Sequence, residues 1–137
     1  MLATYFLFLS LFLQTPDFQG KWITVDDETR VEKSIISLYI ENDKLYGKIE
    51  KLLLDEDKGQ TCINCKGSEK NQPIEGLVIL KGLTKDGNSW TNGKILDPAN
   101  GKEYDCTLTL SGPTKLKVRG FIGFSFLGRT QIWKRSE

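Results

Sequence analysis

The residues best suited to chemistry in this sequence are its cysteines, two of which form a Cys62-Ile-Asn-Cys65 motif. Such a pair could provide half of a zinc site, a redox pair or a structural disulfide. A structural zinc needs a complete tetrahedral ligand set, and the chain has three cysteines and no histidine, so we predict no metal. A thioredoxin-type pair lies at the start of a helix, whereas the flanking residues are not typical of a helix. We therefore favour a disulfide that holds a long loop over redox chemistry.

The rest of the sequence gives little support for an active site. Without histidine, the chain lacks the commonest general base and the usual partner of a nucleophilic serine or cysteine. Asp97 and Asp105 have no spacing that specifies a catalytic pair. Cys106 falls on the apolar face of a predicted strand, where we expect a small buried side chain. The sequence therefore predicts no catalysis and no cofactor.

These residues belong to a chain with the pattern of β-strands. Two strand-like runs flank the turn residues Asp97-Pro98-Ala99-Asn100-Gly101. Proline fixes φ at the first corner of such a turn, and Asn-Gly tolerates positive φ. Apolar and polar residues then alternate from Tyr104 to Leu110, as in a strand with one buried face. This region therefore predicts a hairpin with one dry side.

Similar runs recur at short, even spacing along the chain. They cover residues 18–25, 35–40, 45–50, 77–83, 90–96, 104–110, 116–120 and 129–135. This pattern predicts an all-β fold, a single antiparallel up-and-down barrel of about eight strands. Pairing the first strand with the last would remove both open edges of the sheet. Residues 55–75 break the pattern and predict a long loop.

The N-terminal residues 2–13 are almost wholly apolar. A bilayer-spanning helix needs about 20 residues, whereas this run suits the apolar part of a secretory signal, although no Lys or Arg precedes it. We predict a signal peptide over residues 1–14, a barrel domain over residues 15–137, and export to the periplasm or beyond without a membrane span in the mature chain. The 19 Lys and Arg nearly balance the 18 Asp and Glu, which argues against a nucleic-acid partner. The sequence makes no prediction of oligomeric state.

Five segments carry a resemblance to a known family. They are Gly20-Lys-Trp22, Leu45-Tyr-Gly-Lys-Ile49, the stretch from Gly93 to Tyr104, Val118-Arg-Gly120, and the stretch from Leu127 to Trp133. Together they resemble the bacterial domain of unknown function 2147 family of small exported proteins. The resemblance implies a lipocalin-like β-barrel. In lipocalins an arginine from the end of the barrel packs over a first-strand tryptophan, so Trp22 matches that tryptophan and Arg129 or Arg135 would supply the arginine.

Taken together, these features predict a binding protein that holds a small, mostly apolar ligand inside its barrel. Tyrosines or an arginine would give the polar contact, and the segment Phe121–Leu127 would form an apolar portal, unless its phenylalanines are plain core. The candidate ligand-binding residues are Trp22, Tyr39, Tyr104, Arg119, Phe121, Phe124, Phe126 and Arg129. The alternative is a structural or interaction protein of the cell envelope. It would have a filled barrel and use the Cys62–Cys65 loop and the Phe121–Leu127 segment as a contact surface.

Overall fold

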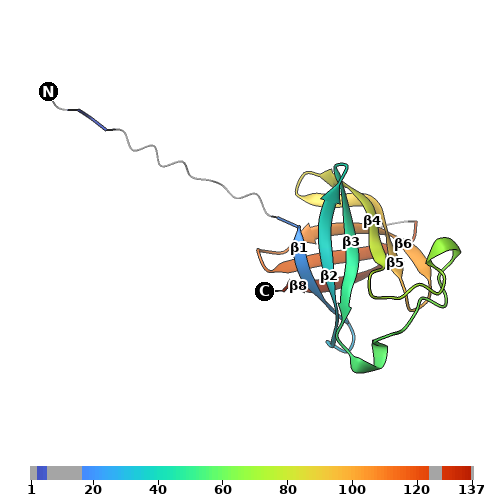
Figure 1. The fold of residues 1–137 in the computed structure, drawn as a ribbon. Coiled ribbons are helices and arrows are strands. Elements are labelled where there is room, and N and C mark those ends of the chain that lie inside the picture. Colours follow the sequence, from blue (N-terminus) through green and yellow to red (C-terminus); the bar gives the residue numbers. More distant parts are fainter. Residues whose placement is uncertain (1–2, 6–16, 124–127, 137) are drawn as a thin grey trace.

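The computed structural model describes residues 3–5, 17–123 and 128–136. The described residues form eight strands (Figure 1), which are β1 (Gly20–Val25), β2 (Glu32–Glu41), β3 (Lys44–Leu52), β4 (Val78–Asp86), β5 (Ser89–Asp97), β6 (Lys102–Leu110), β7 (Lys115–Phe121) and β8 (Gly128–Arg135). Each strand pairs with the next in an antiparallel sense, and β8 pairs with β1 to close a barrel. The predicted fold class is therefore confirmed. Most of the predicted signal segment, residues 1–14, lies outside the described residues.

Short turns join most neighbouring strands, as the sequence predicts. Between β2 and β3, Asn42 and Asp43 both have positive φ, at 51° and 63°, which is the conformation that a two-residue hairpin needs. Between β5 and β6, the Gly101 amide donates to the Asp97 carbonyl over 2.8 Å. Gly101 itself has a φ of +72°, so the glycine expected at this turn has a conformational reason.

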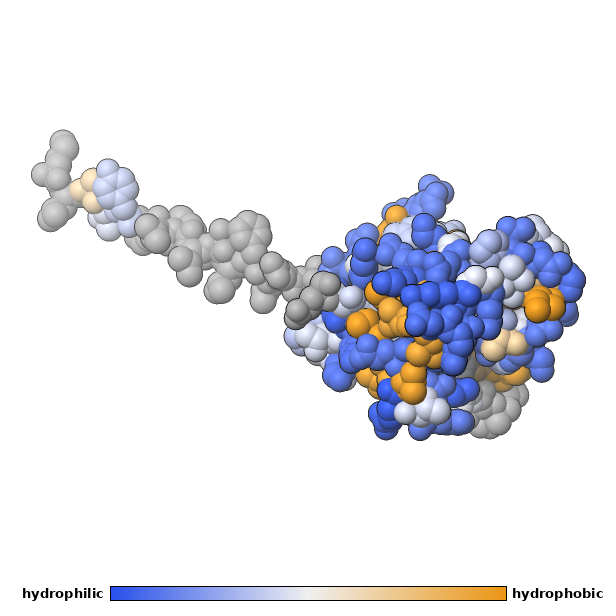
Figure 2. Space-filling view, turned by 60° about the horizontal axis from the view of Figure 1, so that its bottom comes forward, coloured by the Kyte–Doolittle hydropathy of each residue, from blue (hydrophilic) through white to orange (hydrophobic). Residues whose placement is uncertain are grey.

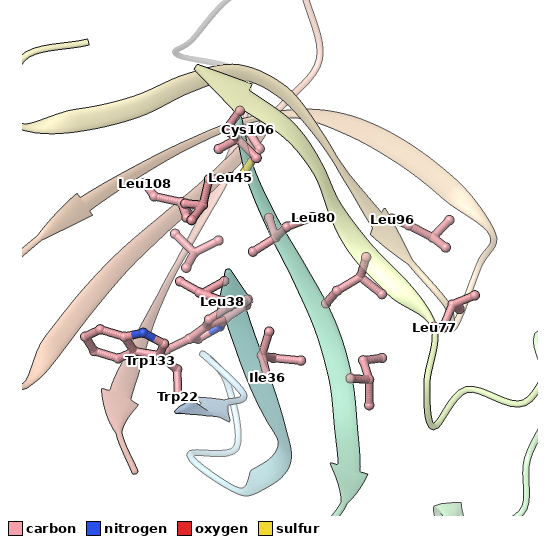
Figure 3. Packing of buried hydrophobic residues seen from close by; sticks show 14 of the residues in the cluster. Trp22, Ile36, Leu38, Leu45, Leu77, Leu80, Leu96, Cys106, Leu108 and Trp133 are labelled. Atoms are coloured by element: carbon pink, nitrogen blue, oxygen red, sulfur yellow. The ribbon is translucent and has the colours of Figure 1, made fainter. Parts of the chain in front are cut away.

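The end of the barrel that carries the β2–β3, β4–β5 and β6–β7 turns, called here the closed end, is packed with apolar side chains. Its fully buried residues include Trp22, Leu45, Leu80, Leu83, Leu108 and Leu116. In Figure 3, Trp22, Leu38 and Leu80 converge in the interior. A Cβ on Gly47 would lie 2.8 Å from Leu80 and 2.9 Å from Leu38. The absence of a side chain at this strand position therefore makes room for two core leucines.

Arg135 and Trp22 complete the closed end. The Arg135 guanidinium lies 4.2 Å from the centre of the Trp22 ring, within the range of a cation–π contact. The same guanidinium donates to the backbone carbonyl oxygens of Gln19 and Pro113 over 3.1 and 3.0 Å. Of the two arginines that the family resemblance implied, Arg135 is therefore the one over Trp22.

A long loop connects β3 to β4 at the opposite end, called here the open end. It contains two short 3-10 helices, η1 (Asp55–Asp57) and η2 (Gly67–Glu69), and a bridge between Thr61 and Pro73. Figure 1 shows the loop in green at the bottom and right of the barrel. Both described helices have three residues, so none of the described helices is long enough to cross a bilayer.

Candidate functional site

A cavity of about 700 Å³ opens at the open end of the barrel. Figure 2, which turns that end toward the viewer, shows apolar residues framed by hydrophilic surface. The apolar lining includes Ile49, Leu52, Ile74, Ile79, Ile95, Val118 and Trp133. The rim comes from the loop after β1, the β3–β4 loop, the β5–β6 turn and the facing ends of β7 and β8. The lining also carries polar and charged side chains, many of them from the loops at the rim. A cavity of this size that combines apolar walls with polar groups is typical of a small-molecule site.

One polar group on the cavity wall is the amide of Gln131, which lies on β8 two residues before Trp133. The Trp133 indole donates from Nε1 to Gln131 Oε1 over 3.0 Å. Trp133 is buried and lines the cavity together with Gln131. An indole N–H can only donate, so this bond fixes which atom of the Gln131 amide is the oxygen.

A pair of hydroxyl groups forms a second polar position. Thr24 Oγ1 of β1 and Ser34 Oγ of β2 lie 2.7 Å apart, and both residues line the cavity. Irregularities in the strand register occur next to both residues, between Thr24 and Val25 and between Ile35 and Ile36. Such bulges change which side chains face the interior. One hydroxyl donates to the other, which leaves the second hydroxyl's proton to be donated elsewhere.

Three of the five described charged residues that line the cavity, Asp26, Asp97 and Arg129, are paired or hydrogen-bonded to the backbone, and the other two are Lys33 and Asp57. Arg129 Nε lies 2.7 Å from each carboxylate oxygen of Asp27. The hydrogen bond from Arg129 lowers the pKa of Asp27 below its ordinary value, and the same bond raises the pKa of Arg129. Asp26 accepts the backbone amides of Glu28 and Thr29 at 2.9 and 2.8 Å. The open end therefore presents Arg129 as part of an ion pair.

The disulfide between Cys62 and Cys65 is present, as the sequence predicts. Both cysteines are buried, and the residues between them reach the β5–β6 turn, where Asn64 Nδ2 donates to the Ala99 carbonyl over 3.1 Å. A Cβ on Gly101 would lie 1.8 Å from the Asn64 carbonyl oxygen. The crosslinked loop thus lies directly against a turn that only glycine fits. Thr61, Ile63 and Asn64 of this loop line the cavity.

Lys81 of β4 forms ion pairs that hold η2, the second 3-10 helix of the same loop, against the barrel. Its Nζ lies 2.8 Å from Glu69 of η2 and 2.6 Å from Glu103 of β6. Burial acts to lower the pKa of Lys81, but the hydrogen bonds to Glu103 and Glu69 outweigh it, and the pKa is raised. Lys81 therefore remains charged and ties the loop to two strands.

Three of the predicted ligand-binding residues line the cavity: Tyr104, Phe121 and Arg129. Tyr104 faces it from β6, and its hydroxyl accepts a hydrogen bond from Asn100 Nδ2 over 3.1 Å. Phe121 lies at the end of β7, on the rim. Two further candidates, Phe124 and Phe126, lie outside the described residues.

The other three candidates, Trp22, Tyr39 and Arg119, are not among the residues that line the cavity. Tyr39 alternates with the buried Leu38 and stacks on Tyr46 outside the barrel, with ring centres 5.8 Å apart. Arg119 alternates with Val118 and donates from Nη1 to Thr130 Oγ1 over 3.0 Å. Trp22 faces inward at the closed end, where its Nε1 donates to the Phe18 carbonyl over 2.9 Å. Strand alternation places Tyr39 and Arg119 on the outer face of the barrel. Trp22 faces inward, but it is packed among the core side chains of the closed end.

Cys106 has the buried position that the sequence predicts. It is 1% exposed and is not part of a disulfide. Burial raises the pKa of its thiol to about 12, so the thiol stays protonated near neutral pH and is a poor nucleophile. Within the described part of the chain, no group of three or more His, Cys, Asp or Glu side chains could hold a metal ion.

Gln131, Thr24 and Ser34 line the cavity but are absent from the sequence-based candidates. Gln131 could have been found, because strand parity places it on the same face as the large apolar side chain of Trp133. Ser34 and Thr24 are harder to find. The strand register shifts near both residues, and no residue type in the sequence indicates these shifts.

Comparison with known proteins adds a family and a fold. A family model described as "Uncharacterized protein conserved in bacteria (DUF2147)" matches residues 20–135. No curated protein matches the chain. Among solved structures, protein HP1028 from the human pathogen Helicobacter pylori, described as belonging to the lipocalin family, matches with a TM-score of 0.78. The two are 21% identical over 90% of this chain and 85% of that chain. The barrel is therefore lipocalin-like in fold.

Proposed function

This chain belongs to the DUF2147 family, and we propose that its barrel binds a small, mostly apolar ligand. The observation that supports this proposal is the cavity of about 700 Å³ with its apolar lining. The closed end is packed, so the ligand would enter through the open end and rest on Trp133. Burial of apolar surface would supply most of the affinity.

A fluorescence titration with N-phenyl-1-naphthylamine, an uncharged apolar dye, tests this proposal. We expect the wild-type protein to increase the dye's fluorescence saturably. The substitution Ile95→Trp should abolish that increase, because Ile95 lines the cavity and an indole there would occupy the space. Ile132→Trp serves as the matched control, since Ile132 lies on the same barrel but is exposed. Equal fluorescence from both variants would place the dye elsewhere and count against the proposal.

Native mass spectrometry gives a second readout. Protein purified from its own host should carry an additional mass that Ile95→Trp protein lacks. An unmodified mass for both proteins, together with no dye binding, would rule out a container function.

We also propose that the protein is exported, with residues 1–14 removed as a signal. The apolar run at residues 2–13 and the disulfide support this proposal, because structural disulfides persist in oxidising compartments. Amino-terminal sequencing of the protein from a periplasmic fraction tests it. A mature chain that begins at Met1 in the cytoplasmic fraction would contradict it.

A second candidate function is a contact surface at the open end. Ile63 and Ile122 are 65% and 64% exposed there, more than apolar side chains usually are. The cavity that the described residues leave at the open end argues against the filled barrel that this alternative requires. Crosslinking in cells with wild-type protein and with Ile63→Ser/Ile122→Ser protein tests the remaining part. A partner lost in the double variant while dye binding persists would favour this function.

A further inference from the structure

We infer that Gln131 determines the ligand's chemical class by donating its amide N–H groups to an uncharged hydrogen-bond acceptor, such as a ketone, ester or amide carbonyl. This inference rests on the proposed function and specifies the site within it. Two observations carry it: the fixed orientation of the Gln131 amide, and the kinds of charged group that reach the cavity.

The orientation of the amide follows from Trp133. The indole Nε1 lies 3.0 Å from Gln131 Oε1, and a donor-only group requires an oxygen at that position. The amide therefore cannot turn over without leaving the buried Trp133 nitrogen without a partner. Such an unpaired buried donor costs about 1–3 kcal/mol, so the bond holds Gln131 in one orientation.

The other edge of the amide is available to a ligand. No described residue accepts a hydrogen bond from Gln131 Nε2, and the nitrogen is not among the buried polar atoms without a partner. It is therefore reached by solvent, and Gln131 lines the cavity. Gln131 thus offers two N–H donors, without an acceptor among the described residues, on a side chain that lines the space a ligand would fill. Tyr104, whose hydroxyl accepts from Asn100, retains its own proton for donation at the rim.

The cavity wall favours an uncharged acceptor over an anion. The polar lining includes the neutral hydroxyls of Thr24 and Ser34. At the rim, Arg129 is engaged with Asp27 through both carboxylate oxygens. The other charged residues of the described lining are the exposed Lys33 and three aspartates, Asp26, Asp57 and Asp97, so negative charges outnumber positive ones. Burying a carboxylate without a partner is costly, whereas a carbonyl needs only one or two donors.

Competition against bound N-phenyl-1-naphthylamine tests the inference with three compounds of matched shape. They are 2-acetylnaphthalene, which carries a ketone, 2-ethylnaphthalene, which lacks an acceptor, and 2-naphthoate, which carries a charge. For the wild-type protein we expect the ketone to compete about fivefold to tenfold better than the ethyl compound, as one net hydrogen bond would give. The naphthoate should be the weakest.

The substitution Gln131→Glu then removes the donors while it keeps an oxygen for Trp133. We expect the ketone's advantage over the ethyl compound to disappear, while the ethyl compound competes as before. Gln19→Glu introduces the same charge at an exposed position outside the cavity and should leave the advantage intact. If Gln131→Glu protein does not fold, Gln131→Leu gives the same comparison.

The possible outcomes separate this inference from the proposed function. Equal competition by ketone and ethyl compound in the wild type would overturn the inference and leave the container proposal standing. So would an unchanged ketone advantage in Gln131→Glu, or the naphthoate as the best competitor. If the dye itself does not bind, the proposed function fails and the inference fails with it.

Discussion

The two ends of the barrel differ in their connections and in how their interiors are filled. At the closed end, Trp22, Leu45 and Leu80 have no exposed surface. At the open end, the strands enclose a cavity of about 700 Å³ and depend on a loop for part of their wall. The comparison separates residues that hold the fold from residues that are available for binding. The substitutions below test that division.

The largest expected effect comes from a substitution at the closed end. Trp22→Ala should lower the free energy of unfolding by about 3–5 kcal/mol, because it leaves a cavity in a packed region and removes the Arg135 contact. Ile95→Ala, in the cavity wall, should cost nearer the lower limit of the roughly 2–5 kcal/mol range for such truncations. Urea unfolding measures both. Equal losses would contradict the division, and Trp22→Phe gives a milder test if Trp22→Ala does not fold.

The next effect concerns the loop at the open end. Gly101→Ala should destabilise the protein by roughly 2–3 kcal/mol, since a positive φ costs about 1–2 kcal/mol and the added Cβ would strike Asn64. Gly112→Ala is the control, because Gly112 has a φ of +78° with nothing within 4 Å of an added Cβ. Hydrogen exchange should show faster exchange at the Cys65 amide in Gly101→Ala alone. Identical behaviour of the two variants would mean that the loop does not depend on Gly101.

The free energy of unfolding, measured as a function of pH, reports on the buried thiol of Cys106. The folded pKa of Cys106 is about 12, above the ordinary value of 9.0. The unfolded chain therefore loses this proton first, and stability falls as the pH rises from about 9 toward 12. By pH 10.5 the loss should reach about 2 kcal/mol.

Cys106→Ala should not show the part of the fall in stability that comes from the thiol. The difference between the wild-type and variant free energies of unfolding at each pH therefore separates the thiol's contribution from that of other groups. A thiol reagent at pH 8 should also react with unfolded but not with folded wild-type protein. Rapid labelling of the folded protein would show that Cys106 is accessible.

The smallest expected effect compares two lysines. Lys81→Met should cost about 1–2 kcal/mol, because it leaves Glu69 and Glu103 without their shared partner in a partly buried site. Lys21→Met should cost less than about 1 kcal/mol, since its bridge to Glu50 is more exposed. Thermal unfolding measures both. A larger loss for Lys21 would indicate that the β3–β4 loop adds little to stability.

Much of the fold could be predicted because strand parity and turn residues depend only on residues that are close together in the sequence. The alternation from Tyr104 to Leu110 and the Asn100-Gly101 turn needed no knowledge of distant residues. Closure of the barrel followed from the cost of open sheet edges. The site was predicted less well. Tyr39 and Arg119 were chosen for their chemistry, whereas their strand parity places them outside.

Other features of the site depend on contacts that no local pattern encodes. Asn64 meets Gly101 across a long sequence separation, and the bulges beside Thr24 and Ile35 are register shifts between strands. Such features arise when strands pair, so they follow from the assembled sheet. The orientation of Gln131 is a partial exception, because its partner Trp133 lies two residues away on the same strand.

The pairing of β8 with β1 also has a consequence for biosynthesis. While the ribosome has yet to release residues 128–135, β1 and β7 both lack the neighbour that closes the sheet, and Arg135 cannot reach Trp22. Closure must therefore await the emergence of β8 from the ribosome. Contacts between such distant parts of a chain form slowly, which would leave the nascent chain unfolded for the time that the proposed export requires.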